Sequence, residues 1–424
     1  MDFNTRRQIR DIIEREVVVA TGCTEPGAVA LCVTKAREVL GCMPDNVRLL
    51  LSRNVYKNAM GVGIPGTGMV GLPIAVAIGL VAGNSEKKLE VLTVDANEVE
   101  KAKQWLSNNA EKISIEIKES CPDKLYIECL CDSNDRHSRV IIEKKHSNFA
   151  YIANEKGVIC DSNECIDTNE GHCNEPRLSV RTVYDYATQT PIEELMFIRE
   201  TVQLNKAAAD EGLKGYGLNT GRILLENANN DLVHTVIART VAASDARMDG
   251  CTMPIYSNSG SGNQGIACTL PVYEYGIAKH CDEETITRAL IFSHLMSIYV
   301  KKGIGRLSAL CGIVNASIGV SCAMAYLCGA TYDQICYSVK NMINTLAGMV
   351  CDGAKPSCAL KMSTGLYSAF VCSELALHDK VVDTCDGLSE KDVDYSIRNL
   401  GRLGHDGMEQ TDDMVLDIMT HKQL

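Results

Sequence analysis

Two cysteines flank a glycine- and proline-containing turn at residues 351–358, which read CDGAKPSC. An amphipathic helix pattern with a start signal at Thr331 precedes this stretch, and a second apolar run over 359–377 follows it. We therefore expect Cys351 to end one helix and Cys358 to begin the next. Amide groups at a helix N-terminus favour negative charge, which suits a thiolate or an anionic cluster at this turn.

A further candidate thiol, Cys23, lies in the run TGCTEPG at 21–27, directly before a helix predicted from Pro26 to about Leu40. The positive end of the helix dipole would lower the pKa of this thiol and raise its thiolate fraction. A thiolate whose pKa is near neutral is a suitable general base. A small buried thiol that only packs at the helix start is the alternative interpretation.

Two glycine-rich loops have the composition of small-anion sites that use backbone amides. The first, 61–68, lacks the ending of a nucleotide-binding P-loop and suits a carboxylate better. The second, 253–265, contains Ser259, Ser261 and Asn263, and is equally well explained as the start of an ordinary helix. Candidate cationic contacts to an anion, each also explained as a solvated lysine, are Lys57, Lys302 and Lys355.

A metal site is suggested by Cys311, which lies in another glycine-rich break, together with Cys351 and Cys358. Three thiolates would leave one iron of a four-iron cluster without a protein ligand, and an open iron is a Lewis acid. Spacing alone does not select this trio over three neighbours that lie inside helical patterns and read as packing residues: Cys322, Cys328 and Cys336.

The remaining cysteines give no comparable signal, although the chain contains 20 of them. An accessory metal site would have to combine five cysteines between residues 129 and 173, whose spacing fits no zinc pattern cleanly. These are Cys129, Cys131, Cys160, Cys165 and Cys173. Buried, inert thiols are the favoured interpretation for them.

Composition excludes several function classes. A net charge of −12, without any basic run interleaved with aromatic residues, argues against a nucleic-acid partner. The charged segment 1–16 does not resemble a secretory signal, and the apolar run 69–82 is too short to cross a bilayer, which takes about 20 residues. We expect a cytoplasmic protein without a membrane partner, in which 69–82 forms a buried helix.

The periodicity of the chain predicts an α+β fold, with a smaller mixed lobe in the N-terminal half and a mostly helical catalytic domain. N-terminal helices at about 4–19 and 26–40, within 1–45, are expected to pack with the catalytic domain. The lobe is expected over 46–155, a linker over 156–189 and the helical domain over 190–424. Expected strands are 47–51, 89–93, 113–117, 125–130, 140–143 and 150–152, with a helix near 97–108.

The runs GCTEPGA at 22–28, SGSGNQG at 259–265 and CDGAKPSC at 351–358 together resemble the L-cysteine desulfidase family, which is related to the α subunit of iron–sulfur L-serine dehydratases. The resemblance extends over nearly the whole chain. It implies that Cys311, Cys351 and Cys358 hold a [4Fe-4S] cluster and that Cys23 is the base. Substrate-binding candidates within or near these motifs are Glu25, Lys57, Asn58, Ser259, Ser261, Asn263 and Lys355.

The activity that the resemblance implies is β-elimination of L-cysteine to sulfide, ammonia and pyruvate. Cys23 would remove the α-proton while the β-sulfur departs, and carboxylate binding to a cation would stabilise the developing carbanion. The nearest alternative is an L-serine dehydratase with the same cluster, since no residue distinguishes loss of thiol from loss of hydroxyl. A redox- or metal-sensing protein without turnover is the alternative from another class. The sequence is also compatible with a homodimer.

Overall fold

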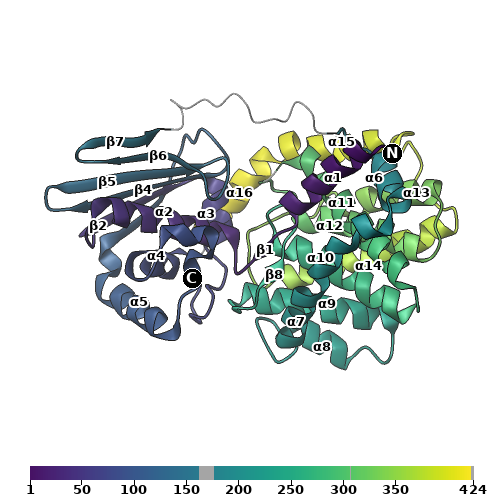
Figure 1. Ribbon diagram of the computed structural model, residues 1–424, viewed down its shortest axis with the longest axis horizontal. Coiled ribbons are helices and arrows are strands. Elements are labelled where there is room, and N and C mark those ends of the chain that lie inside the picture. Colours follow the sequence, from purple (N-terminus) through teal and green to yellow (C-terminus); the bar gives the residue numbers. More distant parts are fainter. Residues whose placement is uncertain (162–175, 306, 422–424) are drawn as a thin grey trace.

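The computed structural model describes residues 1–161, 176–305 and 307–421, and it confirms the predicted α+β class. A sheet-containing lobe lies beside a larger helical body, and α16 (Glu409–Thr420) runs between them (Figure 1). The lobe contains α2 (Thr24–Leu40), α3 (Arg53–Ala59), α4 (Leu72–Val81), α5 (Ala96–Asn109), β2 (Asn46–Leu51), β3 (Ile113–Ile117), β4 (Tyr126–Ser133), β5 (Arg136–Glu143), β6 (Phe149–Asn154) and β7 (Gly157–Asp161). The helical body contains α1 (Phe3–Glu16), α6 (Val180–Gln189), α7 (Glu200–Gly212), α8 (Thr220–Glu226), α9 (Leu232–Met248), α10 (Gly262–Ala278), α11 (Glu283–Ile304), α12 (Gly312–Leu327), α13 (Tyr332–Leu346), α14 (Cys358–Leu377) and α15 (Val393–Arg402).

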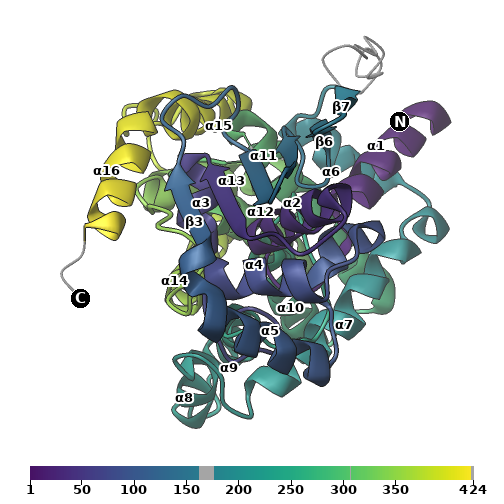
Figure 2. The same cartoon turned by 90° about the vertical axis from the view of Figure 1, so that its left-hand side faces the viewer.

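The strands of the lobe form one sheet in the order β3-β2-β4-β5-β6-β7, in which β2 and β3 are parallel and the other pairs antiparallel. Alternate residues of β2 are buried, namely Val47, Leu49 and Leu51, so one face of the sheet is apolar. Helix α2 packs against β4, β5 and β6, and α4 and α5 continue the helical layer behind it (Figures 1 and 2). This face therefore forms the core of the lobe.

Three expectations about the lobe were wrong in detail. Helix α2 packs in the core of the lobe and not in that of the helical body, because its apolar face covers the sheet. The expected strand 89–93 lies in and just after a 3₁₀ segment, Ser85–Leu92, that packs against α2. A short apolar run does not by itself distinguish a strand from a helical segment. The expected linker 156–189 includes strand β7 and helix α6.

Helix α12 lies at the centre of the helical body and packs against α10, α11, α13 and α14. Nearly all its residues are buried, and many are Ala, Gly, Ser or Cys, which allow helices to approach closely. The capping box predicted at Thr331 and Gln334 is present at the start of α13. None of the described helices combines the length and the apolar character that crossing a membrane requires.

Two contacts of the N-terminal segment connect the lobe to the helical body. Helix α1 packs on the helical body, where Arg6 forms a bidentate salt bridge with Glu194. The next segment, β1 (Val19–Ala20), pairs antiparallel with β8 (Ile255–Tyr256), which precedes α10. This pairing places the beginning of α2 beside the glycine-rich loop 253–265, more than two hundred residues later in the chain.

The C-terminal helix α16 is attached to α3 by two salt bridges of different burial. Lys57 contacts Asp412, and their side chains are 2% and 14% exposed, whereas Arg53 contacts Asp413 at the surface. We predict that Asp412→Asn lowers the free energy of unfolding by about 3 kcal/mol, because it leaves a buried ammonium without its counter-charge. The matched variant Asp413→Asn should cost less than about 1 kcal/mol. Urea unfolding measures both, and equal losses would contradict the prediction.

Candidate functional site

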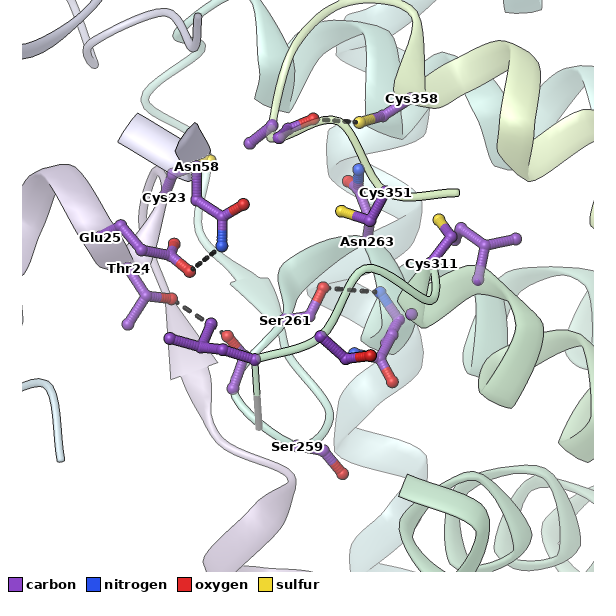
Figure 3. Close-up of a pocket in the computed structure, with 18 of the residues that line it drawn as sticks. Cys23, Thr24, Glu25, Asn58, Ser259, Ser261, Asn263, Cys311, Cys351 and Cys358 are labelled. Atoms are coloured by element: carbon purple, nitrogen blue, oxygen red, sulfur yellow. Dashed lines mark hydrogen bonds between the residues drawn. The ribbon is translucent and has the colours of Figure 1, made fainter. Parts of the chain in front are cut away.

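A cavity of about 130 Å³ lies where the lobe meets the helical body. In Figure 3, Cys23, Glu25 and Asn58 come from the lobe, and Cys311 and Cys351 approach from the helical body. A volume this small admits only a small molecule, since pockets for drug-sized ligands usually occupy about 300–1,000 Å³.

Four helices begin at this cavity. Cys23 is the N-cap of α2, Ser261 that of α10 and Cys311 that of α12, while Cys358 is the first residue of α14. The N-terminus of each helix carries a partial positive charge and free amide groups. The cavity is therefore suited to negative charge, whether on thiolates or on a bound carboxylate.

Cys311 and Cys351 are brought together by a bridge between two extended segments. Leu310 pairs with Val350, and the Cys351 amide donates to the Ala309 carbonyl at 2.6 Å. Helix α13 ends at Leu346, so Cys351 does not end a helix as predicted but follows in this bridge. The segments meet because the chain between them, α12 and α13, forms an antiparallel helical pair.

The thiols of this bridge interact with each other and with nearby cations. A hydrogen bond from the Cys311 thiol lowers the pKa of Cys351, and the Lys57 and Lys361 ammonium groups act in the same direction. Cys358 contacts the Gly353 carbonyl through its sulfur at 3.6 Å. Gly353 has a φ of 91°, and a Cβ there would lie 2.2 Å from the Lys57 carbonyl oxygen, so this turn requires glycine to approach α3.

Cys23 is buried beside Cys358, Val62 and Met248, and is 5% exposed. Burial raises the pKa of the Cys23 thiol to about 11, and the Arg247 guanidinium partly opposes this. The dipole of α2 acts in the opposite direction and was the basis for predicting a lowered pKa. Desolvation of the thiolate outweighs the favourable charges around it.

Arg247, at the end of α9, is a residue of the cavity that the sequence analysis missed. Its guanidinium is buried and donates to the Gly22 carbonyl at 3.0 Å and to Asn263 Oδ1 at 3.2 Å. A Cβ at Gly262 would lie 2.2 Å from its Nε, so the glycine makes room for the side chain. No distinctive signal in the sequence pointed to it, because α9 also contains the charged residues Arg239 and Asp245.

The lobe contributes a second group of polar residues. Asn58 Nδ2 donates to Glu25 Oε1 at 3.0 Å, and His146, from the β5–β6 turn, places Nε2 3.9 Å from the same oxygen. Thr24 Oγ1 donates to the Gly260 carbonyl at 3.1 Å, which joins the start of α2 to the loop before α10. His146 gave no signal in the sequence, because a single histidine in a turn is unremarkable there.

Most of the predicted site residues line this one cavity. They are Cys23, Glu25, Asn58, Ser259, Ser261, Asn263, Cys311, Cys351 and Cys358. Lys57 and Lys355 are not among its lining residues, because their ammonium groups contact Asp412 and Asp352 instead. Besides Arg247 and His146, the cavity is lined by Gln264, Lys301 and Lys361, which the sequence analysis did not single out.

Three cysteine thiols line the cavity, and thiolates are the protein ligands of iron–sulfur clusters. Within the described ranges, no three His, Cys, Asp or Glu side chains converge closely enough to bind one metal ion. The cysteines of a four-iron cluster bind different iron atoms and need not converge on one point. Cys311, Cys351 and Cys358 line one cavity from three separate segments, and we call them the cysteine trio.

The other cysteines considered for a metal site do not form one in the described part of the chain. Cys129 and Cys131 are buried on β4 with their sulfur atoms 3.7 Å apart, whereas Cys160 is exposed on β7. Cys165 and Cys173 lie outside the described residues. The pair on β4 packs with Cys32 in the core of the lobe.

Comparison with known proteins identifies the family. A family model described as the serine dehydratase alpha chain matches residues 86–417, which include the cysteine trio. A protein of Phocaeicola vulgatus described as UPF0597 is 51% identical over 99% of this chain and 98% of its own length. A UPF0597 protein of Bacteroides thetaiotaomicron is 48% identical over 98% of this chain and 98% of its own length. A UPF0597 protein of Aeromonas hydrophila is 41% identical over 97% of this chain and 95% of its own length. The chain belongs to the serine dehydratase alpha chain family.

Proposed function

We propose that the protein is a lyase that eliminates the β-substituent of a small L-amino acid, and that L-cysteine is its substrate. The products would be sulfide, ammonia and pyruvate. The observation that carries this proposal is the placement of Cys23 in one small cavity with the cysteine trio, at the N-termini of four helices. Membership of the serine dehydratase alpha chain family supports a lyase.

The cofactor that we propose is a [4Fe-4S] cluster held by Cys311, Cys351 and Cys358. When bound, such a cluster with one iron free of protein ligands supplies a Lewis acid for the substrate carboxylate and the leaving group. Of the thiolates that would hold it, Cys311 and Cys358 lie at the starts of α12 and α14, where negative charge is favoured. The Lys361 ammonium favours the thiolate form of Cys351.

In this proposal Cys23 takes the α-proton of the substrate. Cys23 lines the cavity, and the Arg247 guanidinium beside it favours the thiolate form, against the burial that raises the pKa of this thiol. Because the cavity is small and its walls are largely buried, substrate entry would displace water and strengthen these charge interactions. Ser259, Ser261 and Asn263, from the loop before α10, supply hydroxyl and amide groups that orient the substrate.

L-serine is the second candidate substrate, because the matching family is described as a serine dehydratase chain. Loss of hydroxyl instead of thiol would leave the roles of Cys23 and the cysteine trio unchanged. Glu25 and Asn58 would likewise serve both amino acids, since they lie beside the start of α2 and not with the trio. The two candidates therefore differ only in the leaving group.

The proposal is tested by supplying anaerobically reconstituted protein with L-cysteine or L-serine and measuring sulfide and pyruvate. We expect equal amounts of sulfide and pyruvate from L-cysteine, and a lower kcat/KM for pyruvate formation from L-serine. A higher value for L-serine would identify a serine dehydratase instead. Absence of pyruvate from both amino acids, in protein that contains iron, would contradict a lyase and favour a sensing role.

A further inference from the structure

The charges around the cavity are distributed unevenly. Glu25 is the only acidic side chain among the described residues that line it, while Arg247, Lys301 and Lys361 provide positive charge. The Glu25 side chain is 15% exposed and comes from the lobe, opposite Cys311 and Cys351 in Figure 3. A cationic group of a ligand would therefore be attracted to the wall of the lobe, and an anionic group to the helix N-termini.

Glu25 is held in place but retains capacity to accept hydrogen bonds. Asn58 Nδ2 donates to its Oε1, whereas its Oε2 accepts no hydrogen bond from the described residues. Asn58 Oδ1 is itself a buried acceptor without a donor in the described structure. Gln264, which is 3% exposed and lines the same cavity, has a second such acceptor in its Oε1.

Buried acceptors without donors are unfavourable unless a ligand supplies the donors. An ammonium group offers three N–H donors and a positive charge, and it matches a carboxylate beside an amide oxygen. A water molecule would satisfy the amide oxygens but would bring no positive charge to the Glu25 carboxylate, which His146 Nε2 approaches only to 3.9 Å. These groups are thus complementary to a primary ammonium ion.

We propose that Glu25 and Asn58 Oδ1 form the subsite for the α-ammonium group of the substrate. This inference rests on the proposed function in taking the ligand to be an amino acid. It orients the substrate with its ammonium at the lobe and its carboxylate towards the starts of α10, α12 and α14. The subsite makes the protein select amino acids over the corresponding acids that lack the amino group.

Binding of L-alanine and propionate to anaerobically reconstituted protein, measured by titration calorimetry, tests the subsite. The two probes differ only in the ammonium group, and neither has a β-substituent that can be eliminated. We expect the wild type to bind L-alanine more tightly than propionate by about 10- to 100-fold, the difference expected for hydrogen bonds to charged groups. Glu25→Gln should remove this preference by weakening L-alanine binding, with propionate binding unchanged or stronger.

Two further variants make the test specific. Asn58→Ala should weaken L-alanine binding about 3- to 10-fold, because it removes one acceptor and the donor that orients Glu25. Glu100→Gln, an equivalent change at an exposed glutamate on α5, should bind both probes as the wild type does. Thermal unfolding of each variant verifies that it is folded.

Unchanged L-alanine binding in Glu25→Gln, or an equal loss for both probes, would overturn the subsite. The same applies if the wild type binds propionate as tightly as L-alanine. These outcomes are independent of turnover. If the protein binds L-alanine through Glu25 but forms no pyruvate, the subsite is supported and the proposed lyase function is wrong. If the wild type turns over L-cysteine and Glu25→Gln binds L-alanine normally, the lyase function is supported and the subsite is wrong.

Discussion

Cys23→Ala is expected to lower kcat for L-cysteine elimination by about 10²- to 10⁴-fold while the protein retains its iron. The loss arises because the variant has no group at this position that can take the α-proton. Cys23 is the N-cap of α2 but makes no capping hydrogen bond through its side chain, so alanine does not remove a cap. The free energy of unfolding should therefore fall only by the small cost of the void that the buried sulfur leaves. Single-turnover and steady-state rates, with iron analysis of the same samples, measure the effect.

The control for this variant is Cys160→Ser, which changes an exposed thiol on β7 at the edge of the lobe. It should retain wild-type rates and iron content. If Cys23→Ala also retains the wild-type rate, the base must be another residue of the cavity. If Cys23→Ala loses iron together with activity, Cys23 takes part in cluster binding and the division of roles proposed above is wrong.

The second large effect concerns the cysteine trio. Cys311→Ala, Cys351→Ala and Cys358→Ala should each lose most of the bound iron and acid-labile sulfide, and with them the lyase activity. A cluster with only two protein thiolates lacks a ligand that holds it in the chain. Iron and sulfide contents of anaerobically reconstituted protein, together with its visible absorbance, measure this loss without depending on turnover.

Neighbouring cysteines provide the matched comparison. Cys322 is buried in α12 and Cys336 lies on α13, and neither lines the cavity. Cys322→Ala and Cys336→Ser should therefore bind iron as the wild type does, although the first also leaves a small void in the helical core. Loss of iron in either variant, with iron retained in Cys311→Ala, would show that the trio has been chosen wrongly.

Several parts of the site could be predicted from the sequence because their signals are local. The capping box at Thr331 identified the start of α13, and the Pro and Gly residues of 351–358 identified the break before α14. Cys23 and Cys358 were expected at helix N-termini, and both occur there. Capping and turn chemistry depend on residues within a few positions of each other, so a single sequence displays them.

Other features could not be predicted, because they depend on partners that are distant in the chain. Lys57 was predicted as a contact for a bound anion, but in the structure its ammonium group contacts Asp412 of α16. Arg247 and His146 gave little sign of a role, since only the packing of α9 and the β5–β6 turn brings them to the cavity. The pKa of Cys23 was expected to be lowered by the dipole of α2, but burial in the folded chain raises it.

By itself, the sequence determined the α+β class, most helix starts and the motifs that carry the thiols, since periodicity and capping are properties of neighbouring residues. Only the tertiary structure decided that four helix N-termini meet at one cavity. It also decided that the lobe supplies Glu25, the only acidic residue among the described residues that line this cavity. The reason is physical: β1 must pair with β8, and Leu310 with Val350, before these segments are adjacent. Such long-range pairings are selected by the packing of the whole chain, which no local pattern encodes.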